Sequence, residues 1–589
     1  MLRNMRFCVG LFSLSLAVIL LLLPACNPED GQQSEEFTVT VRIPREPDVL
    51  NTVRARNFYA TPINNLITLP LAEFDPYDLQ LKPILAESLG DAEEIVDGEY
   101  AGGEAYEFRI RDEAVWDNGE PITGYDYDFT LKAAMNPEVD APAWQAYLSF
   151  IKQVTVDPDD PKKFRVIVAE PYMLAQTITC NFNILPRYFY DPEGLLDPYS
   201  LEDFNDLSES GESGDQPALV EFAQKFASPE FNRDTTVGSG AYFFDEWVSN
   251  QHIIIRKKEG WWGESIPEVQ EMFRANPDQI VYRIIPDEAA AIASLKEGSC
   301  DIGVGLSATA FNQMKKDPQW QEVFGFYTPV LFQYRYLEIN NRHEILKEKA
   351  VRQAIAHVID YEAIIENIEH GEGERTVGPF SPSKDYYNKA LELIDYDVEE
   401  ARQILTDAGW EDTNNNGTVD KVIDGSRREL ELEILTTQSP MGQQVALIAK
   451  EGAAQVGINI DVVTQDASSW RQAIVQRNFD MLPMQVRSSP APNDPFQGWH
   501  SSSDQPGGDN RSGFRNAEAD SIIQLIRSAE NPDERKEHYL ELQEVIYEEQ
   551  PVIFLYIPVE RIIADKRLQL TPSSRRPGYF VNQIRSSDS

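Results

Sequence analysis

One stretch of the chain constrains its fold class more than any other, because a strand, a helix and a second strand are expected there in direct succession. Residues 430–435 alternate apolar and polar side chains, as a half-buried strand does. A helix is predicted over 443–455, and a second strand over 458–463. Such a unit places its two strands in parallel, because the helix carries the chain back to the starting edge of the sheet. The stretch therefore predicts an α/β fold.

Elements elsewhere in the chain fit the same class. Residues 37–41 alternate like a strand, and the apolar run 552–557 predicts a strand buried on both faces. Apolar residues of 351–359 recur at helical spacing and form one stripe that can pack against a sheet. At 589 residues the chain exceeds what one hydrophobic core normally holds, so two or three lobes are expected.

The charge of the chain excludes one class of partner. It contains 97 Asp and Glu residues against 52 Lys and Arg residues, a formal net charge of -45. Such a surface repels phosphate backbones, so we expect no nucleic-acid partner. The charge fits either capture of cationic ligands or solubility in a saline external medium. Acidic residues are scattered through the whole chain, which favours solubility.

The N-terminus carries an export signal. Arg3 and Arg6 precede an apolar run that ends in Leu23-Pro24-Ala25-Cys26, an order typical of a cleaved signal peptide. The cysteine makes this arrangement similar to a bacterial lipobox. That resemblance implies removal of residues 1–25, a lipid-modified Cys26, and a location in the cell envelope facing the periplasm or the exterior. The alternatives are an ordinary signal peptide and an uncleaved anchor. Residues 26–36 are polar and acidic and predict a flexible tether.

Two cysteines remain after such processing, Cys180 and Cys300. An exported location permits a disulfide between them. Two separate buried thiols are the other interpretation, since free cysteine is usually a core residue.

Five stretches together indicate a family. They are residues 106–129, 237–242 with 261–263, 290–302, 351–360 and 398–410. In order and spacing they resemble the peptide and nickel class of extracytoplasmic solute-binding proteins of ABC importers, the oligopeptide- and dipeptide-binding family, over about 37–558. The resemblance implies a two-lobed, periplasmic-binding-protein-like α/β fold (type II, large three-domain class) with a hinge and an interlobe cleft.

The resemblance also implies a domain organisation. The first lobe is expected to be discontinuous, over 37–303 plus 556–589, with the second lobe over 304–555. Within the first lobe, residues 191–236 are rich in Asp, Glu, Ser, Gly and Pro. We predict that they form a surface insertion with a mobile centre.

The implied function is capture of an oligopeptide-like solute and its delivery to an ABC permease by hinge closure, by a monomer that requires no cofactor. The alternative is a lipid-anchored sensory or docking module with the same fold and no transport role. The six histidines are far apart, and neither a G-x-S-x-G motif nor a P-loop occurs. This absence of local motifs favours binding over catalysis, so we expect no enzyme.

Candidate ligand-binding residues follow from the resemblance, because the family binds its solute between the lobes. Gln485-Val486 replaces a Gly-Trp pair of peptide binders, and Ser489 stands where they carry an Asp that pairs with the ligand amine. Asp494 can substitute for that Asp, and Arg487 can bind a carboxylate instead. Each candidate is otherwise an ordinary loop residue or, for the aromatics, a core residue. The candidates are Asn51, Arg54, Asn57, Tyr59, Phe332, Tyr334, Gln485, Arg487, Asp494 and Trp499.

Residues 412–420 contain a D-x-N-x-N-G pattern that predicts a possible structural calcium site. Gly417 permits the tight turn that such loops need. The twelfth position is Ile423, so the bidentate Glu of an EF-hand is missing. An Asx-rich hairpin without an ion is an equally good interpretation. The oxygen ligands would come from Asp412, Asn414, Asn416, Thr418 and Asp420.

Overall fold

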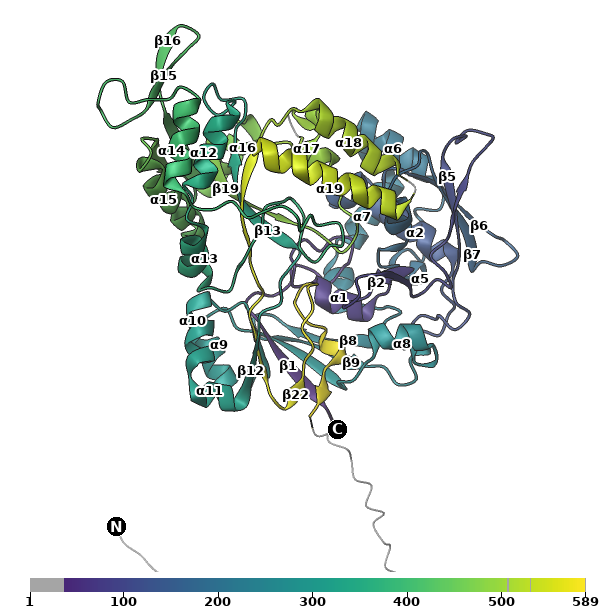
Figure 1. The fold of residues 1–589 in the computed structure, drawn as a ribbon. Coiled ribbons are helices and arrows are strands. Elements are labelled where there is room, and N and C mark those ends of the chain that lie inside the picture. Colours follow the sequence, from purple (N-terminus) through teal and green to yellow (C-terminus); the bar gives the residue numbers. More distant parts are fainter. Residues whose placement is uncertain (1–35, 506–507, 530, 588–589) are drawn as a thin grey trace, which may run out of the picture. The chain divides into compact units, whose positions relative to one another are not determined.

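Three sheets of four or more strands organise the residues that the computed structural model describes, 36–505, 508–529 and 531–587 (Figure 1). The predicted signal peptide, Cys26 and the tether up to residue 35 lie outside these residues. Within the described ranges, every helix is too short or too polar to span a bilayer. The folded body begins at Phe37, whose backbone N–H donates to the carboxylate of Asp278 at 2.9 Å.

The largest sheet has seven strands and contains the predicted N-terminal strand. That strand, β1, pairs in parallel with both β10 and β11. Its residues Val39, Val41 and Ile43 are buried in the largest hydrophobic core of the described chain. The strand order is β12 (Phe324–Tyr327), β21 (Ile562–Asp565), β11 (Ile302–Val304), β1 (Thr38–Ile43), β10 (Gln279–Ile284), β9 (His252–Lys257) and β8 (Tyr242–Val248).

A four-stranded antiparallel sheet shares that core. Helix α2 (Gly124–Met135) packs on it and begins at a capping box, in which Thr123 and Asp126 satisfy each other's backbone N–H groups. Gly124 is needed there because a Cβ atom would lie within 3.0 Å of the Phe164 ring. The strand order is β4 (Ala92–Glu94), β5 (Glu104–Arg109), β7 (Lys163–Val168) and β6 (Ile151–Val156). We call the part built on these two sheets the first lobe.

The six-stranded sheet forms the second lobe and contains the predicted strand–helix–strand unit. β17 and β18 pair in parallel and α15 (Pro440–Ala454) connects them, so this prediction is confirmed. All six residues of β20 are buried, which confirms the predicted core strand. The strand order is β14 (Glu374–Arg375), β20 (Val552–Ile557), β13 (Gln333–Ile339), β19 (Met481–Arg487), β17 (Glu431–Thr436) and β18 (Asn459–Thr464).

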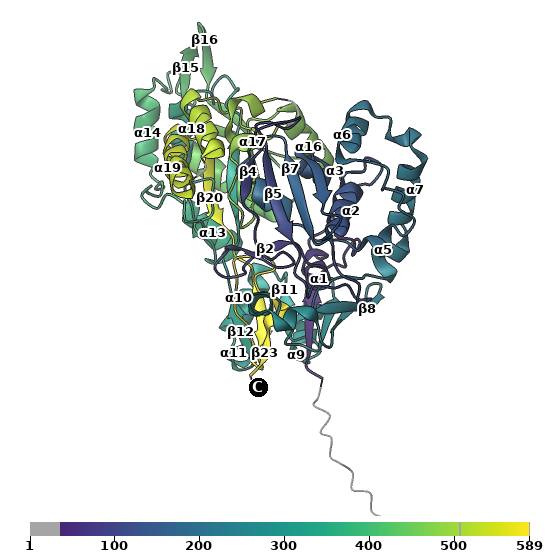
Figure 2. The ribbon, with the colours of Figure 1, turned by 90° about the vertical axis from the view of Figure 1, so that its right-hand side faces the viewer.

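Helices cover both faces of this sheet (Figure 2). One core cluster joins the sheet to α12 (Lys349–His357), α13 (Tyr361–Glu369), α14 (Val398–Asp407) and α15. A second cluster, rich in aromatic rings, joins it to α17 (Phe496–Trp499), α18 (Ala517–Ser528) and α19 (Pro532–Glu549). The apolar stripe predicted over 351–359 lies in the first cluster, with Val351, Ile355, Val358 and Ile359 all buried.

The segment 191–236 differs from its prediction. It was expected to have a mobile centre, and it forms helices α6 (Leu201–Ser210) and α7 (Pro217–Phe226) instead. Ser200 caps α6, and Phe204, Phe222 and Phe226 are buried in the first-lobe core. The polar composition of the segment hides these apolar residues, which anchor the helices.

Two segments carry the chain between the lobes, and they run side by side. The first follows β12 and leads to β13, and the second follows β20 and leads to β21. Val330 and Val559 form an antiparallel bridge, and the backbone N–H of Glu560 donates to the carbonyl oxygen of Pro329 at 3.0 Å. We call residues 328–332 and 558–561 the crossing. The predicted lobe boundary at 556 lies next to it, whereas the predicted boundary at 303 lies before β12, which belongs to the first-lobe sheet.

The remaining elements complete the lobes. In the first lobe they are α1 (Thr61–Ile67), β2 (Ala72–Phe74), β3 (Leu81–Pro83), α3 (Pro142–Leu148), α4 (Ala175–Cys180), α5 (Arg187–Tyr190), α8 (Pro267–Phe273), α9 (Glu288–Lys296), α10 (Ala308–Lys316), α11 (Pro318–Val323), β22 (Leu568–Gln569) and β23 (Arg585–Ser586). The second lobe adds β15 (Asp420–Ile423), β16 (Ser426–Glu429) and α16 (Ala467–Gln476). Cys180 and Cys300 are both buried and form no disulfide with each other, which agrees with their interpretation as two separate core thiols.

Candidate functional site

Beside the crossing, two neighbouring strands of the second lobe place polar side chains on one face. Gln333 lies opposite Arg487, and Arg335 lies opposite Gln485, in the antiparallel β13–β19 pair. Alternate residues of a strand share a face, so these four side chains are grouped. Arg335 donates to the amide oxygen of Gln485 at 3.1 Å. The opposite face is apolar and carries Tyr334 in the aromatic core.

The first lobe reaches the same place through its N-terminal loop and its C-terminal segment. Arg576 donates to the amide oxygen of Gln333 at 3.1 Å, lies 3.6 Å from the carboxylate of Glu560, and has its guanidinium 5.3 Å from the centre of the Phe58 ring. Burial raises the pKa of the neighbouring Tyr59, an effect that the nearby Arg42 and Arg576 oppose. The predicted residues Tyr59 of the first lobe and Gln485 and Arg487 of the second lobe therefore lie in the same region, beside the crossing.

A second ion-pair cluster adjoins this region. The carboxylate of Glu369 accepts a hydrogen bond from the Tyr556 hydroxyl at 2.8 Å and one from Arg561. Nε of Arg335 lies 3.9 Å from the same carboxylate. Arg561 is the last residue of the crossing, so this cluster ties the first-lobe end of the crossing to α13 of the second lobe.

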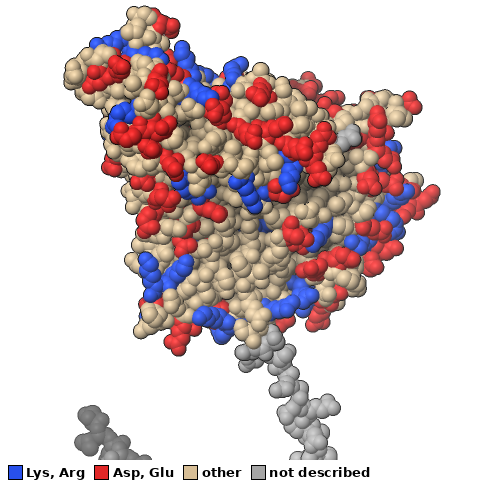
Figure 3. Space-filling view, viewed as in Figure 1, with Lys and Arg blue, Asp and Glu red and all other residues tan. Residues whose placement is uncertain are grey.

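The charge of the crossing region is opposite to that of the molecule. In Figure 3 acidic side chains gather over the upper part and the right-hand side of the face shown, and the whole chain has a formal net charge of -45. At the crossing, by contrast, four arginines meet two glutamates: Arg335, Arg487, Arg561 and Arg576 with Glu369 and Glu560. Burial lowers the pKa of Arg576 and raises that of Glu560, and each partner partly restores the other.

Three of the predicted first-lobe residues build the loop that presents Tyr59. The buried amide oxygen of Asn51 accepts the backbone N–H groups of Val53 and Arg54, at 3.0 and 3.3 Å. Arg54 donates to the side chain of Asn232 at 2.7 Å, and Asn57 donates to the carbonyl of Glu46 at 2.9 Å. All of these contacts lie within the first lobe. They match the alternative interpretation of these three residues as ordinary loop residues.

The predicted aromatic residues lie in the core, the alternative to lining a cleft. Tyr334 and Trp499 pack against Phe554 with ring centres 5.5 and 6.2 Å apart. Phe332 is buried beneath the ammonium group of Lys384, which lies 5.0 Å from its ring centre. Tyr334 and Trp499 belong to the aromatic cluster that packs against helices of the second lobe.

Lys384 holds the loop that follows β19. Its ammonium group donates to the carbonyls of three successive residues, Ser489, Pro490 and Ala491, with 2.8 Å to Ser489 and 2.6 Å to Ala491. Burial lowers the pKa of Lys384 to about 7. The loop is thus fixed by a buried side chain from another part of the second lobe.

Asp494, the predicted substitute for an amine anchor, is already paired within the protein. Its carboxylate lies 3.1 Å from Nε of Arg527 and accepts a hydrogen bond from the Tyr172 hydroxyl at 2.9 Å. The Arg527 guanidinium also lies 4.6 Å from the ring centre of Phe496. Because Tyr172 belongs to the first lobe, Asp494 is a contact between the lobes.

Sequence reasoning missed most partners in these clusters: Tyr172, Arg335, Glu369, Arg527, Glu560, Arg561 and Arg576. The contacts join residues that are far apart in the chain, with separations of 192 residues for Arg561–Glu369 and 243 for Arg576–Gln333. No local motif marks such pairs. The pair Arg575-Arg576 before Pro577 is the nearest to a signal, in a strongly acidic chain.

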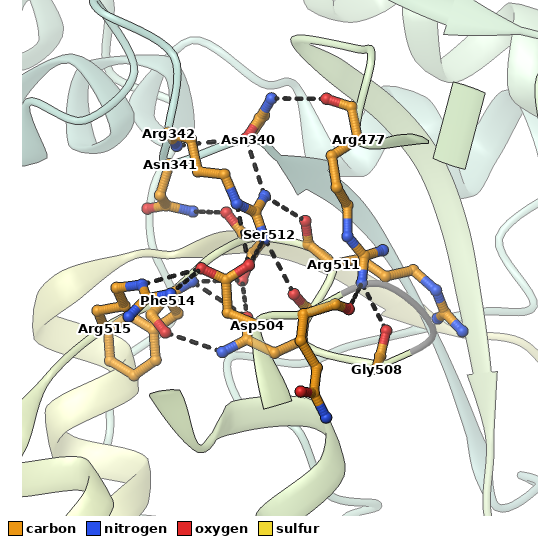
Figure 4. Close-up of polar contacts among 12 residues, drawn as sticks. Asn340, Asn341, Arg342, Arg477, Asp504, Gly508, Arg511, Ser512, Phe514 and Arg515 are labelled. Carbon is orange, nitrogen blue, oxygen red and sulfur yellow. Dashed lines mark hydrogen bonds and ion pairs between the residues drawn. The ribbon is translucent and has the colours of Figure 1, made fainter. Parts of the chain in front are cut away.

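A second polar network of the second lobe joins Arg342 and Arg477 to the segment between Asp504 and Arg515 (Figure 4). Asp504 accepts hydrogen bonds from Nε of Arg342 at 3.0 Å and Nε of Arg515 at 2.9 Å. Arg342 and Arg477 donate to backbone carbonyls of the same segment. Against the effect of burial, the bond from Arg342 holds the pKa of Asp504 below its usual range. Both oxygens of the Asp504 carboxylate already accept hydrogen bonds from arginines of the protein, so we assign this network a structural role.

The oxygen atoms of the predicted calcium loop are used within the hairpin. The Asp412 carboxylate accepts the backbone N–H groups of Asn416 and Gly417, at 3.1 and 2.9 Å. Asp420 pairs with Arg427 and accepts from Thr413, while the side-chain oxygen of Asn416 accepts the N–H of Thr418. Within the described ranges, three or more His, Cys, Asp or Glu side chains nowhere converge as a metal site would require. The predicted loop offers only two carboxylates beside amide and hydroxyl oxygens, and calcium binding by it stays a prediction.

Comparison with known proteins gives a consistent result. A sequence profile described as bacterial extracellular solute-binding proteins, family 5 (middle), matches residues 80–508. The oligopeptide-binding protein AppA of Bacillus subtilis is 26% identical over 534 residues, which cover 89% of this chain and 87% of AppA.

Solved structures share the fold. AppA from Bacillus subtilis in complex with a nonapeptide has a TM-score of 0.64 at 24% identity, covering 93% of this chain and 99% of that one. NikA from Brucella suis in complex with Fe(III)-EDTA has a TM-score of 0.73 at 18% identity, covering 93% and 100%. The ligands of these two proteins differ in chemistry, so the shared architecture does not specify one solute.

Proposed function

We propose a function for this chain from one premise: it belongs to the bacterial extracellular solute-binding proteins of family 5, the peptide and nickel class of ABC-importer binding proteins, and it is not an enzyme. The proposed function is capture of an oligopeptide-like solute between the lobes and its delivery to an ABC permease. The observation that carries it is the crossing region, where Tyr59 and Arg576 of the first lobe meet Arg487 and Gln333 of the second.

The proposed mechanism is hinge closure about the crossing. Two short segments connect the lobes there, and a solute that contacts both lobes binds the closed form more tightly than the open form. That difference in affinity shifts the population toward the closed form, which the permease then recognises. The names of the relatives support a peptide as the solute, since AppA is an oligopeptide-binding protein and its structure holds a nonapeptide.

The test starts from the mature protein, purified and analysed by mass spectrometry for small molecules released on unfolding. The stripped protein is then titrated with short peptides while its unfolding is followed. A ligand present at one hundred times its Kd adds about 2.7 kcal/mol to the free energy of unfolding. Stabilisation by at least one peptide, with a decrease in the radius of gyration, supports the proposal. Absence of both effects with every peptide would contradict it.

We also propose that Cys26 anchors the protein to the membrane through acyl chains, and that the folded body acts as a monomer. Thioether acylation needs the thiol, so Cys26→Ala should move the protein from the membrane to the soluble fraction. Cys8→Ala is the matched control, because Cys8 lies in the same signal segment and is removed with it. Retention of Cys26→Ala in the membrane fraction, equal to that of Cys8→Ala, would refute the lipid anchor.

The alternative function, a sensory or docking module, requires the same binding and the same closure. It differs in the partner, because the closed form would not engage a permease. Uptake of the identified solute by cells that lack this protein separates the two, since loss of uptake occurs under the transport proposal alone.

A further inference from the structure

The carboxylates near the crossing are already neutralised by cations of the protein itself. Glu369 binds Arg561 and the Tyr556 hydroxyl, and Glu560 lies 3.6 Å from Arg576. Asp494, in the loop after β19, lies 3.1 Å from Arg527. Displacing any of these arginines would leave a partly buried guanidinium without its partner, which is costly. A solute that offers an ammonium group therefore finds each of these three acids occupied.

The guanidinium group of Arg487, by contrast, remains available. The Arg487 side chain is exposed and makes no hydrogen bond or ion pair with any residue in the described ranges, although it lies within electrostatic range of Glu560 and Arg576. Arg335 and Arg561 do not share this freedom, because both pair with the carboxylate of Glu369. Arg487 thus retains all five of its donors at the end of β19, beside a region where arginines outnumber glutamates.

The kind of group that satisfies these donors follows from their geometry. A guanidinium presents two parallel N–H groups that match the two oxygens of a carboxylate. The neighbouring side chains of Gln333 and Gln485 already serve as acceptors for Arg576 and Arg335. An acceptor with negative charge, such as a carboxylate of a solute, would therefore match the exposed donors of Arg487.

We infer that the solute of this protein carries a carboxylate, that Arg487 binds it at the crossing, and that a free amine contributes little to its recognition. This inference rests on the proposed function, because it assumes that the solute occupies the region between the lobes. It narrows the solute to anionic or zwitterionic molecules, in spite of a protein surface that is itself strongly acidic.

Four peptide probes of equal length separate the possibilities. The first probe, N-acetyl-tetraalanine, has a terminal carboxylate, and the second, its C-terminal amide, is neutral. The third, tetraalanine amide, has a free amine. The fourth is an acetylated, amidated tetrapeptide that carries one glutamate. Isothermal titration of the stripped mature protein measures each Kd. We expect both carboxylate probes, or the terminal one alone, to bind at least about tenfold more tightly than the neutral amide. The glutamate probe shows whether the carboxylate must be terminal.

Variants assign the effect to Arg487. Arg487→Ala should weaken the carboxylate probes about tenfold and leave the neutral amide unchanged, and Arg487→Lys should restore part of the affinity, since lysine keeps the charge without the fork. Arg165→Ala is the matched control, because Arg165 is an exposed strand arginine of the first lobe, 3.6 Å from Glu93. Arg487 is exposed, so its replacement should leave the melting temperature unchanged.

The outcomes separate this inference from the proposed function. Equal affinity of the wild-type protein for the acid and the amide, or tightest binding of the free-amine probe, would overturn the carboxylate inference and leave solute capture intact. Unchanged binding by Arg487→Ala would overturn the assignment to Arg487. If none of the probes and no other peptide binds, the proposed function fails and this inference fails with it.

Discussion

At the scale of single residues, the pairing of charges decides which side chains remain free for a solute. The sequence leaves both Asp494 and Arg487 as candidates for contact with a ligand. In the structure Asp494 lies against Arg527 and Tyr172, whereas Arg487 has no such partner among the described residues. The difference is electrostatic: a carboxylate next to a guanidinium has little to gain from a second cation.

Glu338 provides a prediction at this scale. It is 3% exposed on β13, accepts a hydrogen bond from the Tyr336 hydroxyl at 3.0 Å, and is near Arg342, Arg477 and Arg511. Burial raises its pKa to about 7. A carboxyl group with a raised pKa in the folded protein binds more protons there than in the unfolded chain, so stability falls as the pH rises from about 4.5 to about 7.

Replacement of Glu338 by Gln should remove that fall. We expect wild type to lose up to about 3 kcal/mol of unfolding free energy relative to Glu338→Gln between pH 4.5 and pH 8. Urea unfolding of both proteins at the two pH values measures the difference. The matched control is Glu431→Gln, an exposed residue of strand β17. A difference between wild type and Glu338→Gln that does not change with pH would show that Glu338 titrates normally.

At the scale of elements, local sequence signals and their neighbours together decide each helix and hairpin. Helix α2 starts where Thr123 and Asp126 cap it, and that signal is readable in the sequence. The hairpin β15–β16 is harder to interpret, because its D-x-N-x-N-G loop serves a cation site and an Asx turn equally well. Arg427 on the second strand pairs with the Asp420 carboxylate, a contact that the loop sequence alone does not predict.

Calcium binding by this hairpin remains a prediction. With only Asp412 and Asp420 charged among the predicted ligands, we expect a weak Kd of about 10⁻⁴ to 10⁻³ M, as in extracellular sites. Melting temperatures in calcium and in chelator measure it. Asp412→Asn should abolish any shift, whereas the control Asp424→Asn at the hairpin turn should not. A shift that saturates at micromolar calcium would contradict the expectation.

At the scale of the whole molecule, the lobes are joined at the crossing and also touch through Tyr172. The Tyr172 hydroxyl donates to Asp494, its ring lies 5.4 Å from the Arg527 guanidinium, and Met173 packs against the aromatic core of the second lobe. Burial and the Asp494 charge raise the pKa of Tyr172, so the hydroxyl keeps its proton and donates throughout the physiological pH range. This contact holds the lobes together in the described structure.

Tyr172→Phe removes that hydrogen bond and keeps the ring beneath Arg527. A hydrogen bond to a charged acceptor contributes about 1.5–3 kcal/mol, so we expect the solute-free variant to be more open and to bind solute roughly tenfold more weakly. Small-angle scattering measures the opening and calorimetry the affinity. Tyr125→Phe, at an exposed first-lobe tyrosine, is the control. An unchanged radius of gyration together with unchanged affinity would show that the contact does not influence closure.

Much of the architecture was predictable because it depends on short-range patterns. The strand–helix–strand unit of the second lobe, the buried strand β20 and the start of α2 follow from apolar periodicity and capping, which involve residues a few positions apart. Helices α6 and α7 were missed for a related reason. Their few buried residues, such as Phe204 and Phe222, are diluted by Asp, Glu and Ser, and tertiary burial compensates for the polar composition.

The sequence by itself determined the α/β class, the acidic character and the resemblance to solute-binding proteins. The tertiary structure alone decided which charges cancel, because pairs such as Arg561–Glu369 and Tyr172–Asp494 join positions 192 and 322 residues apart. Coulomb interactions and hydrogen bonds act over a few ångströms in space, and distance along the chain does not predict them. For that reason only the folded structure shows that Arg487, one candidate among ten in the sequence, lies at the crossing without an ion-pair partner among the described residues.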